Sequence, residues 1–179
     1  MPLRQQPARD RCRVTTTAGV LALGNLQAQI DGQAREALAG RLDASGQAEL
    51  VELLLLRGHV LGCIAHYERA EAGAERLTHD RPTDGVAFLA RARARATFHR
   101  FTDALGDLDD ALRLGADPAD VDAERAAIFQ AIGRYDEAFT ILRNAVERRA
   151  DFASLAALAS LCADRGEVAT AEHLFEESR

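Results

Sequence analysis

Apolar residues recur at helical spacing along almost the whole chain after residue 16. From Thr17 onward they return every three or four positions, which is the pattern of amphipathic helices that each bury one face. Turn-forming residues interrupt this pattern at regular intervals, at Asp31-Gly32, Ser45-Gly46, Gly133, Asp151, Gly166 and the segments 82–85 and 115–118. In the segment 115–118, Asp117 can cap a helix whose first residue is Pro118. The pattern therefore predicts an all-α chain of short helices.

The sequence is similar to itself when it is shifted by 34 residues, or by 33 in the last step. A large apolar position recurs at Tyr67, Phe101, Tyr135 and Val168. Alanine follows three residues later each time, at Ala70, Ala104, Ala138 and Ala171. A second column of small residues holds Gly58, Ala92, Ala126 and Ala159. Small side chains let two helices approach closely where they cross, so we predict repeated helix pairs that stack on their neighbours.

These columns resemble those of the tetratricopeptide repeat. The best single match is the hexapeptide Gly133-Arg134-Tyr135-Asp136-Glu137-Ala138, followed by Ala145. The resemblance implies a right-handed α-solenoid of antiparallel helix pairs, with four repeats at 51–84, 85–118, 119–151 and 152–179. It also implies a degenerate repeat or N-terminal capping helix pair at 17–50, with its turn at Gly32. We expect the four later pairs to turn near Ala65, His99, Gly133 and Gly166.

Residues 1–16 contain two prolines and four arginines without helical periodicity, and we expect them to form a flexible lead-in.

A curved array of this kind has a concave face, lined mainly by the first helix of each pair. The resemblance and helical projection together place eleven candidate partner-binding residues there: Glu52, Leu55, His59, Cys63, Val86, Leu89, Arg93, Thr97, Asp120, Gln130 and Ser160. We expect Arg93 and His59 to be exposed, and to suit a peptide that has an apolar anchor and an acidic group. The alternative is that this face is only solvated and that binding occurs elsewhere.

The chain shows no nucleophile–base motif, no phosphate-binding loop and no dinucleotide glycine fingerprint. We therefore predict a non-enzymatic scaffold for protein–protein interaction, without a cofactor. The alternative is an accessory or regulatory region of a longer enzyme or regulator. His59, Cys63 and His66 have a spacing that could place three ligands near a metal, but a small apolar cysteine and two ordinary histidines are the preferred interpretation.

Arginines 57, 91 and 125 recur at the 34-residue spacing. We interpret them as structural, with each guanidinium group reaching a carboxylate such as Asp107 or Asp109. A phosphate-binding ladder is the alternative, and the negative net charge argues against it.

An apolar stripe at helical spacing closes the sequence, at Val168, Ala171, Leu174 and Phe175. An exposed stripe of this kind usually marks an interface. We expect either that the natural protein continues into further repeats or that two copies pair through this end as a two-fold dimer.

Charge and cysteine content narrow the class of partner. The net charge is −6, the 22 basic residues are all arginine, and both signs are spread along the chain, so we expect no nucleic-acid partner. No apolar run has the length needed to span a bilayer, so we expect no membrane association. Cys12, Cys63 and Cys162 are far apart and odd in number, which favours a reducing compartment, and we predict a cytoplasmic protein.

Overall fold

The computed structural model describes residues 17–177, and the predicted flexible segment 1–16 lies outside this range. The described residues form helices and turns, without a strand. The helices are α1 (Thr17–Leu38), α2 (Ala44–Leu61), α3 (Ile64–Asp80), α4 (Gly85–Thr97), α5 (Phe101–Arg113), α6 (Pro118–Ala131), α7 (Tyr135–Arg148), α8 (Phe152–Asp164) and α9 (Val168–Glu177).

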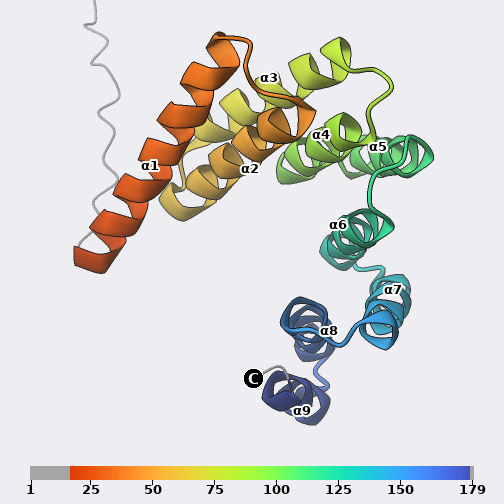
Figure 1. Cartoon of the computed structure of the whole chain (residues 1–179). Coiled ribbons are helices and arrows are strands. Elements are labelled where there is room, and N and C mark those ends of the chain that lie inside the picture. The colour runs from red at the N-terminus through yellow and green to blue at the C-terminus, as the bar shows by residue number, and fades with distance from the viewer. Residues whose placement is uncertain (1–16, 178–179) are drawn as a thin grey trace, which may run out of the picture.

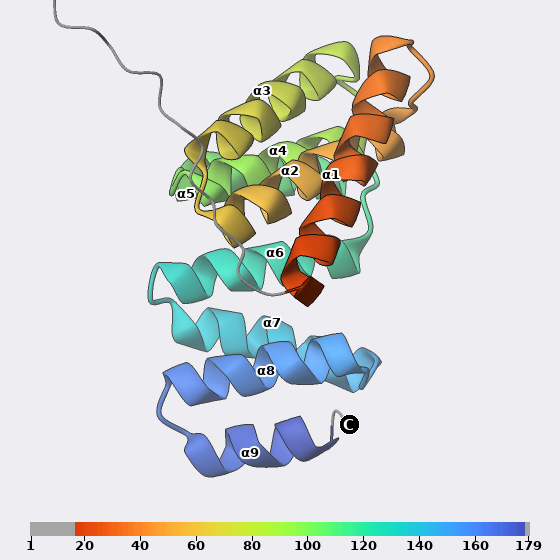
Figure 2. The same cartoon turned by 90° about the vertical axis from the view of Figure 1, so that its left-hand side faces the viewer.

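Eight of these helices form four antiparallel pairs that stack along a curve (Figure 1). The first helices of the pairs, α2, α4, α6 and α8, lie on the inner side of the curve, and α3, α5, α7 and α9 lie on the outer side. Figure 2 shows α6 to α9 as successive layers, with α1 running across the earlier helices α2 and α4 in front of them. The predicted all-α solenoid is confirmed.

Aspartates begin several of the helices. Asp117 Oδ1 accepts a hydrogen bond from the amide of Ala119 at 2.8 Å, and Pro118 opens α6, as the sequence predicts. Asp43, at the start of α2, accepts from the amide of Gly46 in the same way. The expected break at Ser45-Gly46 is therefore wrong, because these residues form the first turn of α2.

The N-terminal region differs most from its prediction. Residues 17–50 do not form a helix pair, because α1 continues through Gly32 without a turn and ends at Leu38. Glycine in a helix costs about 1 kcal/mol relative to alanine. The burial of Leu26 and Ile30 in the contact with α2 outweighs that cost.

The turns of the later pairs follow the repeat closely. Backbone φ is positive at His99, Gly133 and Gly166, which confirms these three turns. The first turn lies at Gly62, where φ is 60°, and α3 already begins at Ile64, so the expected turn near Ala65 is late by two to three residues.

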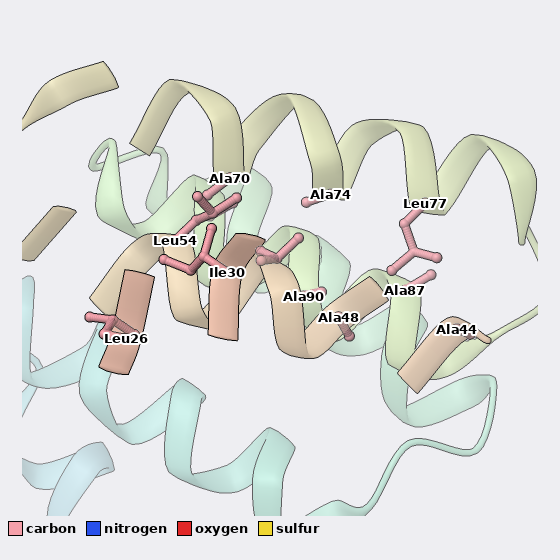
Figure 3. Packing of buried hydrophobic residues seen from close by; sticks show 12 residues of the cluster. Leu26, Ile30, Ala44, Ala48, Leu54, Ala70, Ala74, Leu77, Ala87 and Ala90 are labelled. Carbon is pink, nitrogen blue, oxygen red and sulfur yellow. The ribbon is translucent and has the colours of Figure 1, made fainter. Parts of the chain in front are cut away.

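The core is built from small side chains held between larger aliphatic ones. In Figure 3, Ala70, Ala74 and Leu77 of α3 face the helices below them. Gly58 is buried, and a Cβ atom at this position would lie 2.6 Å from the ring of Tyr67. All residues of the two predicted small columns are buried between helices. No helix of the described region is long and apolar enough to cross a membrane.

Candidate functional site

An open groove lies over the inner helices α2, α4 and α6. It encloses about 580 Å³. Its lining combines two glutamates and an arginine with apolar and small side chains: Glu52, Leu55, Arg93, Ala96, Thr97, Phe101, Glu124, Ala127, Ile128 and Ala131. A concave surface with apolar lining and a few polar groups is the usual form of a binding site.

Helical periodicity explains why these residues share one surface. On α6, Glu124, Ala127, Ile128 and Ala131 stand three or four positions apart, so they lie on one face of the helix. The three alanines that line the groove, on α4 and α6, have short side chains, which leaves the space between the helices open.

Arg93 connects three of the inner helices. Its Nε donates to Glu124 Oε1 on α6 at 2.7 Å, and its Nη1 donates to Glu52 Oε1 on α2. The arginine side chain is 22% exposed. Burial lowers the pKa of Arg93, but the charges of Glu124, Glu52 and Asp120 outweigh it and raise the pKa above its ordinary value. The guanidinium group is therefore charged and already paired.

This pairing corrects the prediction that Arg93 is exposed. His59 is exposed as predicted, but it is not part of the groove lining. An acidic ligand at Arg93 would meet the carboxylates of Glu52, Asp120 and Glu124.

The other predicted partner-binding residues fall into three groups. Leu55 and Thr97 line the groove together with Glu52 and Arg93. Leu89 is wrong as a groove residue, because it is only 5% exposed and packs in the core of the second and third pairs. The remainder lie outside the groove lining: Cys63 precedes α3, Val86 packs against the core of α1 to α4, and Gln130 and Ser160 lie on α6 and α8. Asp120 also lies outside the lining, at the start of α6, but its charge acts on Arg93.

Gln130 makes a contact that joins two repeats. Its Nε2 donates to Asp164 Oδ2 on α8 at 2.5 Å. A partner that binds Gln130 would therefore have to compete with this contact inside the protein.

Six residues of the lining are absent from the eleven predicted partner-binding residues: Ala96, Phe101, Glu124, Ala127, Ile128 and Ala131. Glu124 follows the predicted Asp120 by one helical turn, so the same projection could have found it. Phe101 belongs to the aromatic column, and its role in the groove depends on the packing of α5 against α4, which the column does not reveal.

A second polar cluster joins α3, α4 and α5. Asp107 is buried and accepts hydrogen bonds from Arg91 Nη2 at 2.7 Å and from Arg95 Nη1 at 2.8 Å. Both arginines also contact Glu75. The structural role predicted for Arg91 is confirmed.

The other two arginines of that series differ from each other. Arg125 pairs with Asp109 at 2.8 Å, which confirms its predicted partner. Arg57 pairs with no carboxylate of residues 17–177 and instead donates to His66 Nε2 at 3.1 Å and to the carbonyl oxygen of Leu23 at 3.4 Å. No group of three His, Cys, Asp or Glu side chains in residues 17–177 is placed to hold a metal.

The C-terminal apolar stripe is only partly exposed. Val168 and Phe175 are 59% and 43% exposed, Leu174 is half-buried, and Ala171 is buried against α8. Ala171 is therefore a core residue and is wrong as a member of an end interface.

Comparisons with known proteins show similarity at the level of structure. No family model matches the sequence, and no curated protein matches it. TTC0263, a thermophilic TPR protein of Thermus thermophilus, is 19% identical over 90% of this chain and 85% of its own, with a TM-score of 0.74. The chain has the tetratricopeptide-repeat (TPR) fold.

Two further solved structures share this TPR fold. A tetratricopeptide repeat protein from Parabacteroides merdae is 18% identical over 88% of this chain and 61% of its own, with a TM-score of 0.69. YrrB, described as a TPR protein with an unusual peptide-binding site, is 17% identical over 82% of this chain and 72% of its own, with a TM-score of 0.53. TPR arrays are repeat scaffolds that present an extended concave surface for protein interaction.

Proposed function

We propose that this chain is a protein-interaction scaffold that binds a peptide segment of a partner protein in the groove over α2, α4 and α6. The observation that carries the proposal is the groove itself, which is open, concave and lined by apolar atoms around a fixed ionic centre. Its volume of about 580 Å³ has the size of sites that hold small ligands or a few side chains. The peptide-binding site reported for YrrB, which shares the fold, adds support.

The apolar contacts would come from Leu55 and Phe101, and the alanines of α4 and α6 would leave room for the backbone of the peptide. Burial of one Leu-sized side chain from the peptide would contribute about 1.5–3 kcal/mol. That is enough for measurable affinity only when several contacts form together.

A random dodecapeptide library displayed on phage tests the proposal even though the partner is unidentified. We expect to find clones that bind the wild-type protein but do not bind the variant Ala127→Trp. A large ring at this exposed groove position would fill the space that the peptide needs. The matched control is Ala72→Trp, at an exposed alanine of the outer helix α3. If both variants retain the same clones, the groove is not the binding site.

The predictions of a cytoplasmic location and of a homodimer through the C-terminal end remain proposals. Cys63 and Cys162 are free thiols, which supports a reducing compartment. The exposure of Val168 supports an apolar contact at α9.

A further inference from the structure

The ionic centre of the groove carries more negative than positive charge. Three carboxylates, from Glu52, Asp120 and Glu124, act on the single guanidinium group of Arg93. The four groups together leave a net charge of −2 when all are ionised, from three negative charges and one positive charge. Arg93 is already paired with two of the carboxylates. A second positively charged group would therefore be needed to balance the remaining negative charge.

The carboxylates are placed to accept such a cation. Arg93 uses one oxygen of Glu52 and one oxygen of Glu124, and no residue of the described range donates a hydrogen bond to the other oxygen of either group. The two glutamate side chains are 47% and 27% exposed, and Asp120 is exposed. A guanidinium or ammonium group that enters the groove would therefore find free acceptor oxygens within a partly desolvated surface, where charged hydrogen bonds are strong.

An apolar surface lies directly beside these oxygens. Leu55 is one helical turn from Glu52, and the exposed Ala127 is one helical turn from Glu124. Phe101 adds an aromatic ring from α5. A ligand that seats an apolar side chain here brings its neighbouring residue close to the carboxylates.

We propose that the groove selects peptide segments in which an arginine or lysine stands next to an apolar residue. This inference rests on the proposed function and adds the chemistry of the partner. An acidic segment is disfavoured, because its carboxylate would approach Arg93 only through the field of Glu52, Asp120 and Glu124.

The test compares the sequences of clones selected from the random dodecapeptide library. Among the clones that bind the wild type but not Ala127→Trp, we expect arginine and lysine to be enriched several-fold over the starting library. A fluorescein-labelled copy of the most enriched peptide should bind the double variant Glu52→Gln/Glu124→Gln about five- to tenfold more weakly than the wild type. The control Glu172→Gln/Glu176→Gln makes the same charge change on exposed residues of α9 and should leave the affinity unchanged.

A third variant reverses the sign of the effect. Arg93→Gln removes the competing cation, so the same peptide should bind at least as tightly as it does to the wild type, provided that circular dichroism shows an intact helical fold. Weaker binding to folded Arg93→Gln overturns the inference.

The failure of this inference is distinguishable from the failure of the proposed function. Selected clones that depend on Ala127 but are rich in aspartate and glutamate overturn the inference and leave groove binding in place. A selection with no clone that depends on Ala127 overturns both.

Discussion

At the scale of single residues, one tight contact with backbone atoms lies at the start of α4. Gly85 is buried, and a Cβ atom at this position would lie 2.6 Å from the carbonyl oxygen of Ala111 and 2.6 Å from the amide nitrogen of Ala116. Both atoms belong to the backbone at the end of α5 and the turn that follows it. They cannot move away as the tip of a flexible side chain can.

Gly85→Ala should therefore destabilise the protein by about 1–3 kcal/mol, the usual cost of forcing atoms into a packed core. The matched control is Gly106→Ala in the interior of α5, where the added Cβ would have no atom within 4 Å apart from the nearby backbone of its own helix. There the better helix propensity of alanine should stabilise the fold by about 0.5–1 kcal/mol. Urea unfolding followed by circular dichroism measures both changes. Equal effects of the two substitutions would contradict the close contact at Gly85.

The turn residues show what the repeat register can and cannot predict. His99 stands where the later repeats have Gly133 and Gly166, and it adopts the same left-handed backbone, with φ of 58°. Residue propensity alone would not predict a turn at histidine. The prediction of this turn came from the 34-residue register of the repeat. The same register missed the turn at Gly62 by two to three residues, because α3 begins three residues before Tyr67, whereas α5 and α7 begin at the matching Phe101 and Tyr135.

At the scale of elements, the cluster around Asp107 holds three consecutive helices together. Arg91 and Arg95 stand one turn apart on α4, and each reaches both Asp107 on α5 and Glu75 on α3. Their side chains are 17% and 16% exposed, so the ion pairs are largely removed from water. Loss of one partner from such a cluster is costly, because the remaining charges lose their compensation.

Asp107→Ala should lower the free energy of unfolding by about 3 kcal/mol, since Arg91 and Arg95 would then share only Glu75. Asp109→Ala is the control, because it also breaks one arginine pair, but Asp109 is 71% exposed. That change should cost at most about 1 kcal/mol. Chemical denaturation checks the difference, and a loss at Asp107 no larger than at Asp109 would show that the cluster adds little stability.

The same cluster predicts how stability depends on pH. Burial raises the pKa of Glu75, but its hydrogen bond with Arg95 and the charges of Arg95 and Arg91 outweigh burial and leave the pKa below its ordinary value of 4.5. A lowered pKa in the folded state contributes stability above the unfolded value, and that stability is lost as pH falls through the folded value. The contribution of Glu75 should therefore be complete above about pH 4.5 and disappear below it.

Thermal melts between pH 3 and pH 7 measure this effect when wild type and Glu75→Gln are compared. The melting temperature of the variant should fall less steeply below about pH 4.5 than that of the wild type. Parallel pH curves for the two proteins would contradict the role assigned to Glu75.

At the scale of the whole molecule, α4 joins the first three helix pairs. It contacts α2, α3, α5 and α6. Arg91 and Arg95 bind the outer helices from one face, and Arg93 binds α2 and α6 from the other face. Alternating arginines thus diverge around α4, because positions two residues apart on a helix point in different directions.

The arrangement of pairs could be predicted because each pair repeats the same contacts at a fixed spacing. The detail of the groove could not, because it depends on how far each helix is rotated about its own axis. Leu89 lies in the core and Arg93 in the groove, although residues four positions apart lie on the same side of an ideal helix. The partners of Arg93, at sequence separations of 31 and 41 residues, also lie off the register of the repeat.

The central claim is that the inner groove binds a peptide. Amide chemical-shift mapping by nuclear magnetic resonance tests it most directly, with isotope-labelled protein titrated with the most enriched dodecapeptide. We predict that the largest shifts fall at Ala96, Ala127 and Ala131, whose amides belong to the helices that line the groove. Shifts confined to the outer helices α3, α5 and α7, with those three alanines unchanged, would contradict the account.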